Sequence, residues 1–244
     1  MTVRAAGRSG LLAITILVTA APTASSHVVS DREVRLLRDL PAGLVMRAAA
    51  ADTPDAMGLA APNRAPWRDV YHQHGALLLL MDAAARGDTA QAEMAWKAVD
   101  AAFVRQTPAG DFEPGPPPSR ESRLLHMSGV AVWLAELCRA EVVVMNSPLQ
   151  DRFRWRVALM LPKLRRSIDW LAASAGDLWQ LHAGRPDLLL ADAQAFLLAD
   201  GIFHEPRLNQ LGQRSLVAAL KAQGSNGAFQ RGGDPPTACQ ARAS

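Results

Sequence analysis

A repeated turn pattern, Gly-x-Phe, constrains the fold of this chain more than any other feature of its sequence. It occurs at Gly110–Phe112, Gly201–Phe203 and Gly227–Phe229, each time after a stretch of helical periodicity. In the first and third copies a glutamine, Gln106 or Gln223, stands four residues before the glycine. A helix end leaves carbonyl groups that need a donor, glycine reaches the positive φ that turns the chain back, and phenylalanine can seal the turn. The repeat therefore predicts stacked helical hairpins.

Apolar residues recur at helical spacing along most of the chain, and no window alternates apolar and polar residues long enough for a strand. The 244 residues, 49% of them hydrophobic, suffice for one buried core. We therefore expect an all-α fold built of antiparallel helical hairpins. Helices are expected over residues 30–39, 67–86, 90–106, 119–145, 149–173, 186–199 and 206–223, and another restarts at Pro41. Loops are expected at 52–66 and 107–119, and a linker at 174–185.

The N-terminal segment has the composition of a secretory signal peptide. Arg4 and Arg8 give a positive start, residues 11–21 form an apolar run, and small residues follow up to Ser26. The apolar run is too short to span a bilayer, so we expect a secreted or periplasmic protein with no membrane span in its mature chain. The expected organisation is a signal peptide at 1–26, a helical domain at 27–233 and a disordered or aberrant tail at 234–244.

Charge and cysteine content narrow the classes of partner. Residues 1–26 carry two arginines and no acidic residue, so the net charge of +3 falls to +1 without them, which argues against nucleic acid. Two interpretations of the cysteines stay open: a disulfide between Cys138 and Cys239, or a buried free thiol at Cys138, which we favour. Phosphate-loop, nucleophile-elbow, Cys-x-x-Cys and His-Glu-x-x-His motifs do not occur, so we expect no cofactor and no metal.

The spacing Gln-x3-Gly-x-Phe resembles the QW-type repeat of α/α toroids, the family of terpene cyclases and related helical barrels, with phenylalanine in place of tryptophan. Residues 195–233 are also similar to the helical toroid domains of polysaccharide lyases and glycoside hydrolases. The chain departs from these families in having too few helices for a twelve-helix toroid and in lacking an Asp-x-Asp-Asp motif. The resemblance implies an incomplete or truncated α/α toroid. Apolar periodicity stops after Gly233, which fits truncation, and an ordinary disordered tail is the alternative.

The resemblance also suggests candidate catalytic residues. A lyase acting on uronic acid glycans needs a base, often tyrosine or histidine, to take a proton from the sugar ring. Tyr71, the only tyrosine, stands close to His74 in the sequence, and His126 is a third candidate. His72 and His74 face different ways on a helix and make a poor metal pair. The alternative is a half-buried tyrosine and a solvated histidine without catalytic roles.

Candidate substrate-binding residues fall into two groups. Polar residues on the Gly-x-Phe turns could line a cleft, and a pair of carboxylates at suitable separation could hydrolyse a glycoside. Turn and helix-start chemistry explains the same residues without a substrate. Tryptophan could stack on a sugar, and an arginine-rich helix could dock an anionic glycan. The candidates are Asp111, Glu113, Asp200, His204 and Glu205 on the turns, Trp179, and Arg152 and Arg156 on the helix.

The sequence thus predicts a secreted helical protein that acts as a non-catalytic scaffold or glycan-binding module, with a polysaccharide as its partner. The alternative is a glycan-active enzyme, a polysaccharide lyase or glycoside hydrolase, with a cleft at the turn-rich end. The first is favoured because no catalytic constellation is evident in the sequence.

Overall fold

The computed structural model describes residues 25–49, 54, 67, 69–114 and 120–223. Within these ranges every secondary-structure element is a helix. The expectation of an all-α fold is confirmed. The predicted signal peptide lies outside the described residues except for its last two, and the tail at 234–244 lies outside them entirely. The helices are α1 (Ser25–Asp39), α2 (Ala42–Ala49), η3 (Val70–Gln73), α3 (His74–Arg86), α4 (Thr89–Val104), α5 (Arg120–Met145), α6 (Gln150–Ala173), α7 (Ala175–Leu181), α8 (Pro186–Phe203) and α9 (Pro206–Lys221).

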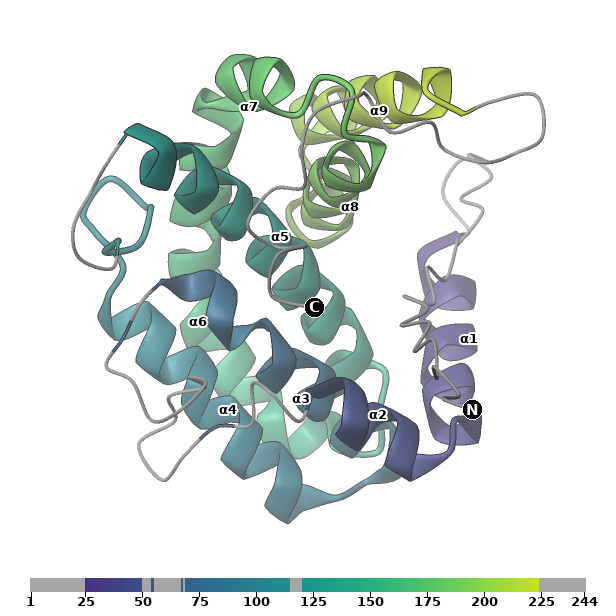
Figure 1. Cartoon of the computed structure of the whole chain (residues 1–244). Helices are drawn as coiled ribbons and strands as arrows, with labels where there is room; N and C mark the ends of the chain where they lie inside the picture. Colours follow the sequence, from purple (N-terminus) through teal and green to yellow (C-terminus); the bar gives the residue numbers. More distant parts are fainter. Residues whose placement is uncertain (1–24, 50–53, 55–66, 68, 115–119, 224–244) are drawn as a thin grey trace, which may run out of the picture.

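Helix α5 is the centre of the fold, because it packs against α3 on one side and α8 on the other (Figure 1). Each of these three helices also packs against the helix that follows it, so that α4 pairs with α3, α6 with α5 and α9 with α8. Helices α1 and α2 pack on α3, and α7 contacts α5 and α6. The described chain is therefore organised as three packed helix pairs, with α3, α5 and α8 as neighbours.

The first Gly-x-Phe turn contributes directly to the core. Phe112 is fully buried and lies edge-on to Trp133 of α5, with ring centroids 5.0 Å apart. Phe103 of α4 completes the cluster, 5.5 Å from Trp133 and 5.9 Å from Phe112. Edge-to-face aromatic contacts of this kind add to the free energy of burying the rings. The prediction that this phenylalanine seals the turn against the helices is confirmed.

The same turn is fastened to α6 by polar contacts. Gly110 has φ 106°, the positive value that the sequence predicts. Gln106 donates from Nε2 to the carbonyl oxygen of Lys163 at 2.7 Å and to Oγ of Ser167 at 2.8 Å. Ser167 Oγ in turn donates to the carbonyl oxygen of Gly110 at 2.6 Å. The glutamine therefore satisfies a carbonyl of α6, a different helix from the one that it follows.

The second Gly-x-Phe copy is not a turn, and the prediction that the helix ends at Ala199 and the chain turns at Gly201 is wrong. Helix α8 continues through Gly201 to Phe203, and the residue with positive φ is His204, at 54°. The N–H of His204 donates to the carbonyl oxygen of Asp200 at 2.7 Å and ends the helix. Pro206 then begins α9 at a position where its missing N–H costs nothing. The third copy, at Gly227–Phe229, lies outside the described residues.

Other helix boundaries also differ from the prediction. Helix α1 begins at Ser25, five residues before the expected start, and the expected linker at 174–185 contains α7. The C-terminal end of α1 is held by Arg86 of α3, which donates from Nη2 to the carbonyl oxygens of Leu37 and Leu40 at 3.3 and 2.5 Å. The guanidinium thus supplies donors to carbonyl groups that a helix end leaves open.

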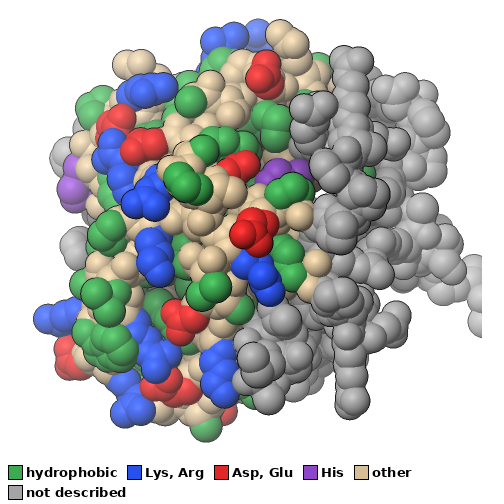
Figure 2. Space-filling model, turned by 90° about the vertical axis from the view of Figure 1, so that its left-hand side faces the viewer, with side chains coloured by type: hydrophobic (Ala, Val, Ile, Leu, Met, Phe, Trp, Pro, Cys, Tyr) green, Lys and Arg blue, Asp and Glu red, His purple; other side chains and the backbone are tan. Residues whose placement is uncertain are grey.

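Surface composition sets limits on the kind of partner. No helix in the described ranges is both long and apolar enough to cross a membrane. Figure 2 shows acidic, basic and hydrophobic side chains interspersed on the face that it presents, without a large area of one charge. A surface of this kind favours recognition through a local site over recognition through a long-range field.

Candidate functional site

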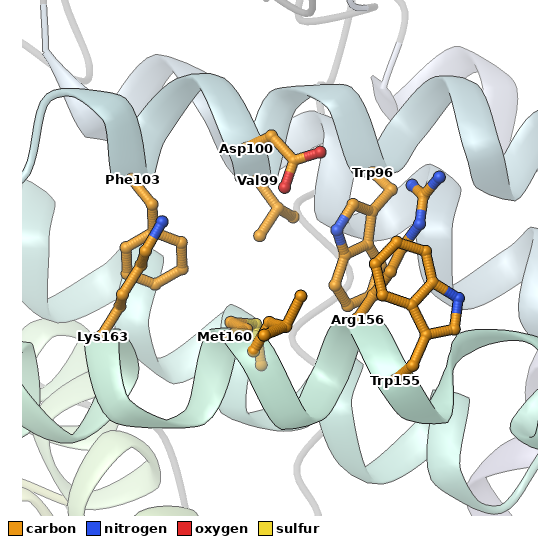
Figure 3. A pocket seen from close by; sticks show the side chains of 9 residues that line it. Trp96, Val99, Asp100, Phe103, Trp155, Arg156, Met160 and Lys163 are labelled. Atoms are coloured by element: carbon orange, nitrogen blue, oxygen red, sulfur yellow. The ribbon is translucent and has the colours of Figure 1, made fainter.

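A groove of about 250 Å³ lies between α4 and α6 (Figure 3). It exists because α4 pairs with α3 and α6 pairs with α5, so that α4 and α6 face each other without close backbone packing. The lining side chains from each helix recur at three- and four-residue spacing, which places them on one helix face. They are Trp96, Val99, Asp100 and Phe103 from α4, and Trp155, Arg156, Leu159, Met160 and Lys163 from α6.

The floor of the groove is apolar and rigid. Trp96, Phe103 and Met160 are buried and belong to the hydrophobic core. Trp155 and Leu159 stand at the edge instead, with 58% and 66% of their surface exposed. A tryptophan held this far in solvent next to a hollow offers a flat apolar face to a ligand.

Charged side chains complete the groove. Asp100 reaches solvent at the rim, while its inner side is covered; this partial burial raises the pKa of Asp100, and the nearby Arg156 opposes the rise. The Arg156 guanidinium lies 5.2 Å from the Trp155 ring centroid, and its Nη2 is 2.6 Å from a carboxylate oxygen of Glu93. Lys163 is exposed, with Nζ 5.8 Å from the Phe103 ring centroid. The groove therefore combines an aromatic platform, a carboxylate and two cations.

Of the two predicted arginines, Arg156 lines the groove and Arg152 does not. Arg156 lines the groove, as the hypothesis of a glycan-docking arginine requires. Arg152 lies outside it and contacts the same acidic residue, with Nη2 3.2 Å from Oε1 of Glu93. Arg152 thus supports the orientation of Glu93 at the edge of the groove.

Comparison with protein-family models, with curated proteins and with solved structures finds no match to this chain.

The first two catalytic candidates lie against each other. The rings of Tyr71 in η3 and His74 at the start of α3 are stacked with centroids 4.8 Å apart. Nδ1 of His74 is 2.7 Å from the carbonyl oxygen of Tyr71, so this nitrogen carries the hydrogen. Tyr71 also packs on α5 at Gly129, where an added Cβ would lie 3.0 Å from the Cβ of Tyr71. These contacts place the pair at the junction of η3, α3 and α5.

The third candidate, His126, lies on α5 one helical turn before Gly129. It is buried, and this burial lowers its pKa, while Asp111 and Asp69 act in the opposite direction. The backbone of Phe112 is within electrostatic reach of the ring, but neither ring nitrogen makes a hydrogen bond of ordinary geometry within the described part of the chain. A buried neutral imidazole is a poor proton acceptor for a substrate that stays in solvent.

The acidic residues of the first turn have local contacts. Asp111 accepts a hydrogen bond from the hydroxyl of Thr107 across the turn. Glu113 is exposed, and its carboxylate lies 4.0 Å from Nη1 of Arg105. These contacts are turn chemistry, and neither carboxylate lines the groove.

The polar residues at the end of α8 also have partners. Asp200 accepts from Nδ2 of Asn209 at 3.0 Å and so links α8 to α9. Glu205 is 2.6 Å from Nη2 of Arg165 on α6. His204 is the left-handed residue that ends α8. All three connect helices, and none lines the groove.

Trp179, the predicted stacking residue, lies on α7 and is held by contacts with α9. Its indole N–H donates to Oγ of Ser215 at 2.8 Å, and the guanidinium of Arg214 lies 3.7 Å from its ring centroid. The ring face that a sugar would need is covered by an arginine of α9. Trp155 is the better placed tryptophan, because it is exposed and lines the groove.

A second constellation, Ser128, His182 and Asp192, was not identified from the sequence. The three side chains form a continuous hydrogen-bonded chain across α5, the end of α7 and α8. Ser128 and His182 are 54 residues apart, so no sequence spacing joins them. The available signal was an aspartate in the middle of the apolar helix α8, because a buried carboxylate needs a partner.

Metal chemistry finds no support in the described part of the chain, where no group of three or more His, Cys, Asp or Glu side chains could hold an ion. Cys138 is buried and has no disulfide partner among the described residues. Burial raises the pKa of its thiol far above the ordinary value, so Cys138 stays protonated and serves as core packing.

Proposed function

We propose that this protein is a glycan-binding module whose groove between α4 and α6 holds a residue of an acidic polysaccharide. The observation that carries the proposal is the exposed Trp155 ring at the edge of a hollow with Asp100 and Lys163. A sugar ring presents a face of C–H groups to an aromatic platform and hydroxyl groups to a carboxylate. A uronate carboxylate would be attracted to the lysine ammonium and to Arg156.

The size and rigidity of the groove support a small group. Its volume of about 250 Å³ is below the roughly 300–1,000 Å³ of sites for drug-sized molecules, which suits one sugar residue of a longer chain. The buried floor is fixed by core packing, so little side-chain freedom is lost on binding. The groove should bind a single sugar residue weakly. A polymer offers many such residues, so its apparent affinity should be higher.

Replacing Trp155 with alanine should weaken binding of an acidic polysaccharide by about five- to thirtyfold, because loss of the stacking surface removes about 1–2 kcal/mol. Lys163→Glu should weaken binding of a polyuronate such as polygalacturonate or alginate, but should change binding of a neutral dextran little. Affinity electrophoresis and titration calorimetry of the full chain against these polymers measure both effects.

The matched control is Arg154→Glu. Arg154 lies on α6, does not line the groove, and has 61% of its side chain exposed. Within the described residues its ion pair is with Asp151. The substitution changes charge by the same amount as Lys163→Glu and should leave binding within about twofold. Equal losses in both variants would reveal a general charge effect and contradict the groove. Folded wild-type protein that binds no polymer would contradict the function itself.

A second candidate, an enzyme that cleaves glycans, is favoured by the contact between Tyr71 and His74. A phenol stacked on an imidazole is a pairing that can move a proton from a uronate ring, as in a lyase. If this holds, the full chain should release unsaturated uronates from a polyuronate, and Tyr71→Phe should lower that rate at least about 100-fold. Absence of unsaturated product, measured by ultraviolet absorbance, would exclude the lyase and leave the binding module.

We also infer that the three packed pairs are successive hairpins of an incomplete α/α toroid. Short connections between α3 and α4, α5 and α6, and α8 and α9, together with contacts along α3, α5 and α8, support this arrangement. An experimental structure in which these three helices do not line one side of the array would contradict it.

We also propose that the protein is secreted. Cleavage near Ser26, read from the mass of protein recovered from a bacterial periplasm, would support it, and an uncleaved chain there would not.

A further inference from the structure

A serine, a histidine and an aspartate are joined in a hydrogen-bonded chain that none of the preceding roles uses. Oγ of Ser128 on α5 is 2.7 Å from Nε2 of His182, which follows α7. Nδ1 of the same ring is 2.7 Å from Oδ2 of Asp192 on α8. We propose that this chain makes Ser128 an activated nucleophile that accepts small acyl groups from carboxylic esters.

Burial fixes which atom carries each proton. Asp192 is fully buried, and its Oδ1 makes no hydrogen bond within the described residues, so its described side-chain partner is Nδ1 of His182. An ionised carboxylate only accepts hydrogen bonds, so the imidazole hydrogen lies on Nδ1 and the lone pair on Nε2. That lone pair faces the Ser128 hydroxyl, as a general base must.

Solvent exposure differs among the three residues in the way that a catalytic triad requires. Asp192 and His182 are 0% and 1% exposed, and the serine is partly exposed. The orienting carboxylate and the base are therefore shielded from water, while Ser128 keeps part of its surface in solvent. Partial exposure of Ser128 admits a small acyl group, such as acetyl, more readily than a bulky one.

The reaction needs only an ester and water. Oγ of Ser128 bonds to the ester carbonyl carbon as its proton moves to Nε2 of His182. The bond from that carbon to the alkoxy oxygen breaks, and the alcohol leaves with the proton from Nε2. A water molecule then attacks the acyl carbon while Nε2 takes its proton. The acyl–serine bond breaks, the proton returns to Oγ, and a carboxylic acid is released.

The position of Ser128 within a helix limits the rate. Backbone N–H groups in the middle of α5 donate to carbonyl groups one turn before them, so they are not available to an oxyanion. General-base catalysis alone contributes about 10²–10⁴-fold, well below what a hydrolase with an oxyanion hole achieves. We therefore expect acylation by activated esters with slow deacylation, so that the acyl-serine accumulates.

The test is to incubate the full-length chain with p-nitrophenyl acetate, to follow nitrophenolate release, and to map acetylation by peptide mass spectrometry. A burst of nitrophenolate of about one equivalent is expected, with the acetyl group on Ser128. Ser128→Ala should abolish the burst. His182→Gln, which keeps a polar side chain, should slow acetylation at least about 100-fold.

Ser215→Ala is the matched control, because Ser215 is also a helical serine with a side-chain partner, the Trp179 indole in place of a histidine, although Ser215 is fully buried. It should leave the burst unchanged. The wild-type chain also tests the proposal without any variant: a folded protein with no acetyl group on Ser128, or with acetylation only on lysines, would overturn it. So would an equal rate in a folded His182→Gln variant, since the three residues would then only fasten α5, α7 and α8 together.

Discussion

Replacing Gly110 with alanine should lower the free energy of unfolding by about 2–5 kcal/mol. The glycine has φ 106°, where a residue with a side chain is strained by about 1–3 kcal/mol. A Cβ there would also lie 2.4 Å from the carbonyl oxygen of Arg166 and 2.9 Å from its carbonyl carbon. Relief by movement is difficult, because Ser167 holds the Gly110 carbonyl against α6. Urea unfolding followed by circular dichroism measures the loss.

Gly201→Ala is the control for this substitution, because it makes the same chemical change in the second Gly-x-Phe copy. Gly201 lies inside α8, and a Cβ there would meet no atom within 4 Å. Alanine is the better helix former, so this variant should gain about 0.5–1 kcal/mol. A reversed result, with Gly201→Ala the damaging change, would contradict the helical position of Gly201 inside α8.

The contrast between these glycines shows how far the sequence pattern could lead. Both stand two residues before a phenylalanine, yet only Gly110 turns the chain. At the second copy, apolar burial along α8 outweighs the small cost of a helical glycine, and the turn moves to His204 beside Pro206. Helix periodicity was sufficient to predict most of the helices, but it missed α7, and a local motif did not specify which residue ends a helix.

The residues of the candidate site were harder to predict from the sequence than the helices. Helical spacing correctly places Trp155 and Arg156 on α6, but it gives no information about which helix faces them. The groove arises from the pairing of α4 with α3 and of α6 with α5, a property of the whole array. Turn acids such as Asp111 and Asp200 were candidates because carboxylates can do chemistry, and in the structure each is engaged by a neighbouring Thr or Asn side chain.

The stability of the fold should depend on pH through Glu141, a largely buried carboxyl group on α5. Burial raises the pKa of Glu141 to about 7 from an ordinary value of 4.5. In the unfolded chain Glu141 ionises as pH rises through 4.5, whereas in the folded chain it stays protonated until about pH 7. The folded state therefore loses stability between these two values, and the loss is complete above pH 7. A tenfold difference in acidity between the folded and unfolded chains corresponds to about 1.4 kcal/mol, so the rise from 4.5 to about 7 corresponds to a full loss of about 3–4 kcal/mol.

Glutamine at position 141 keeps the shape of the side chain without a charge to bury. Glu141→Gln should therefore raise the free energy of unfolding by about 3–4 kcal/mol at about pH 8 and by little at about pH 4.5, measured by urea unfolding at both values. Asp151→Asn removes the same charge from a side chain that is 94% exposed, so it should change stability by less than about 0.5 kcal/mol at the higher pH. An equal gain at both pH values for Glu141→Gln would mean that packing, and not the burial of charge, sets the cost of this residue.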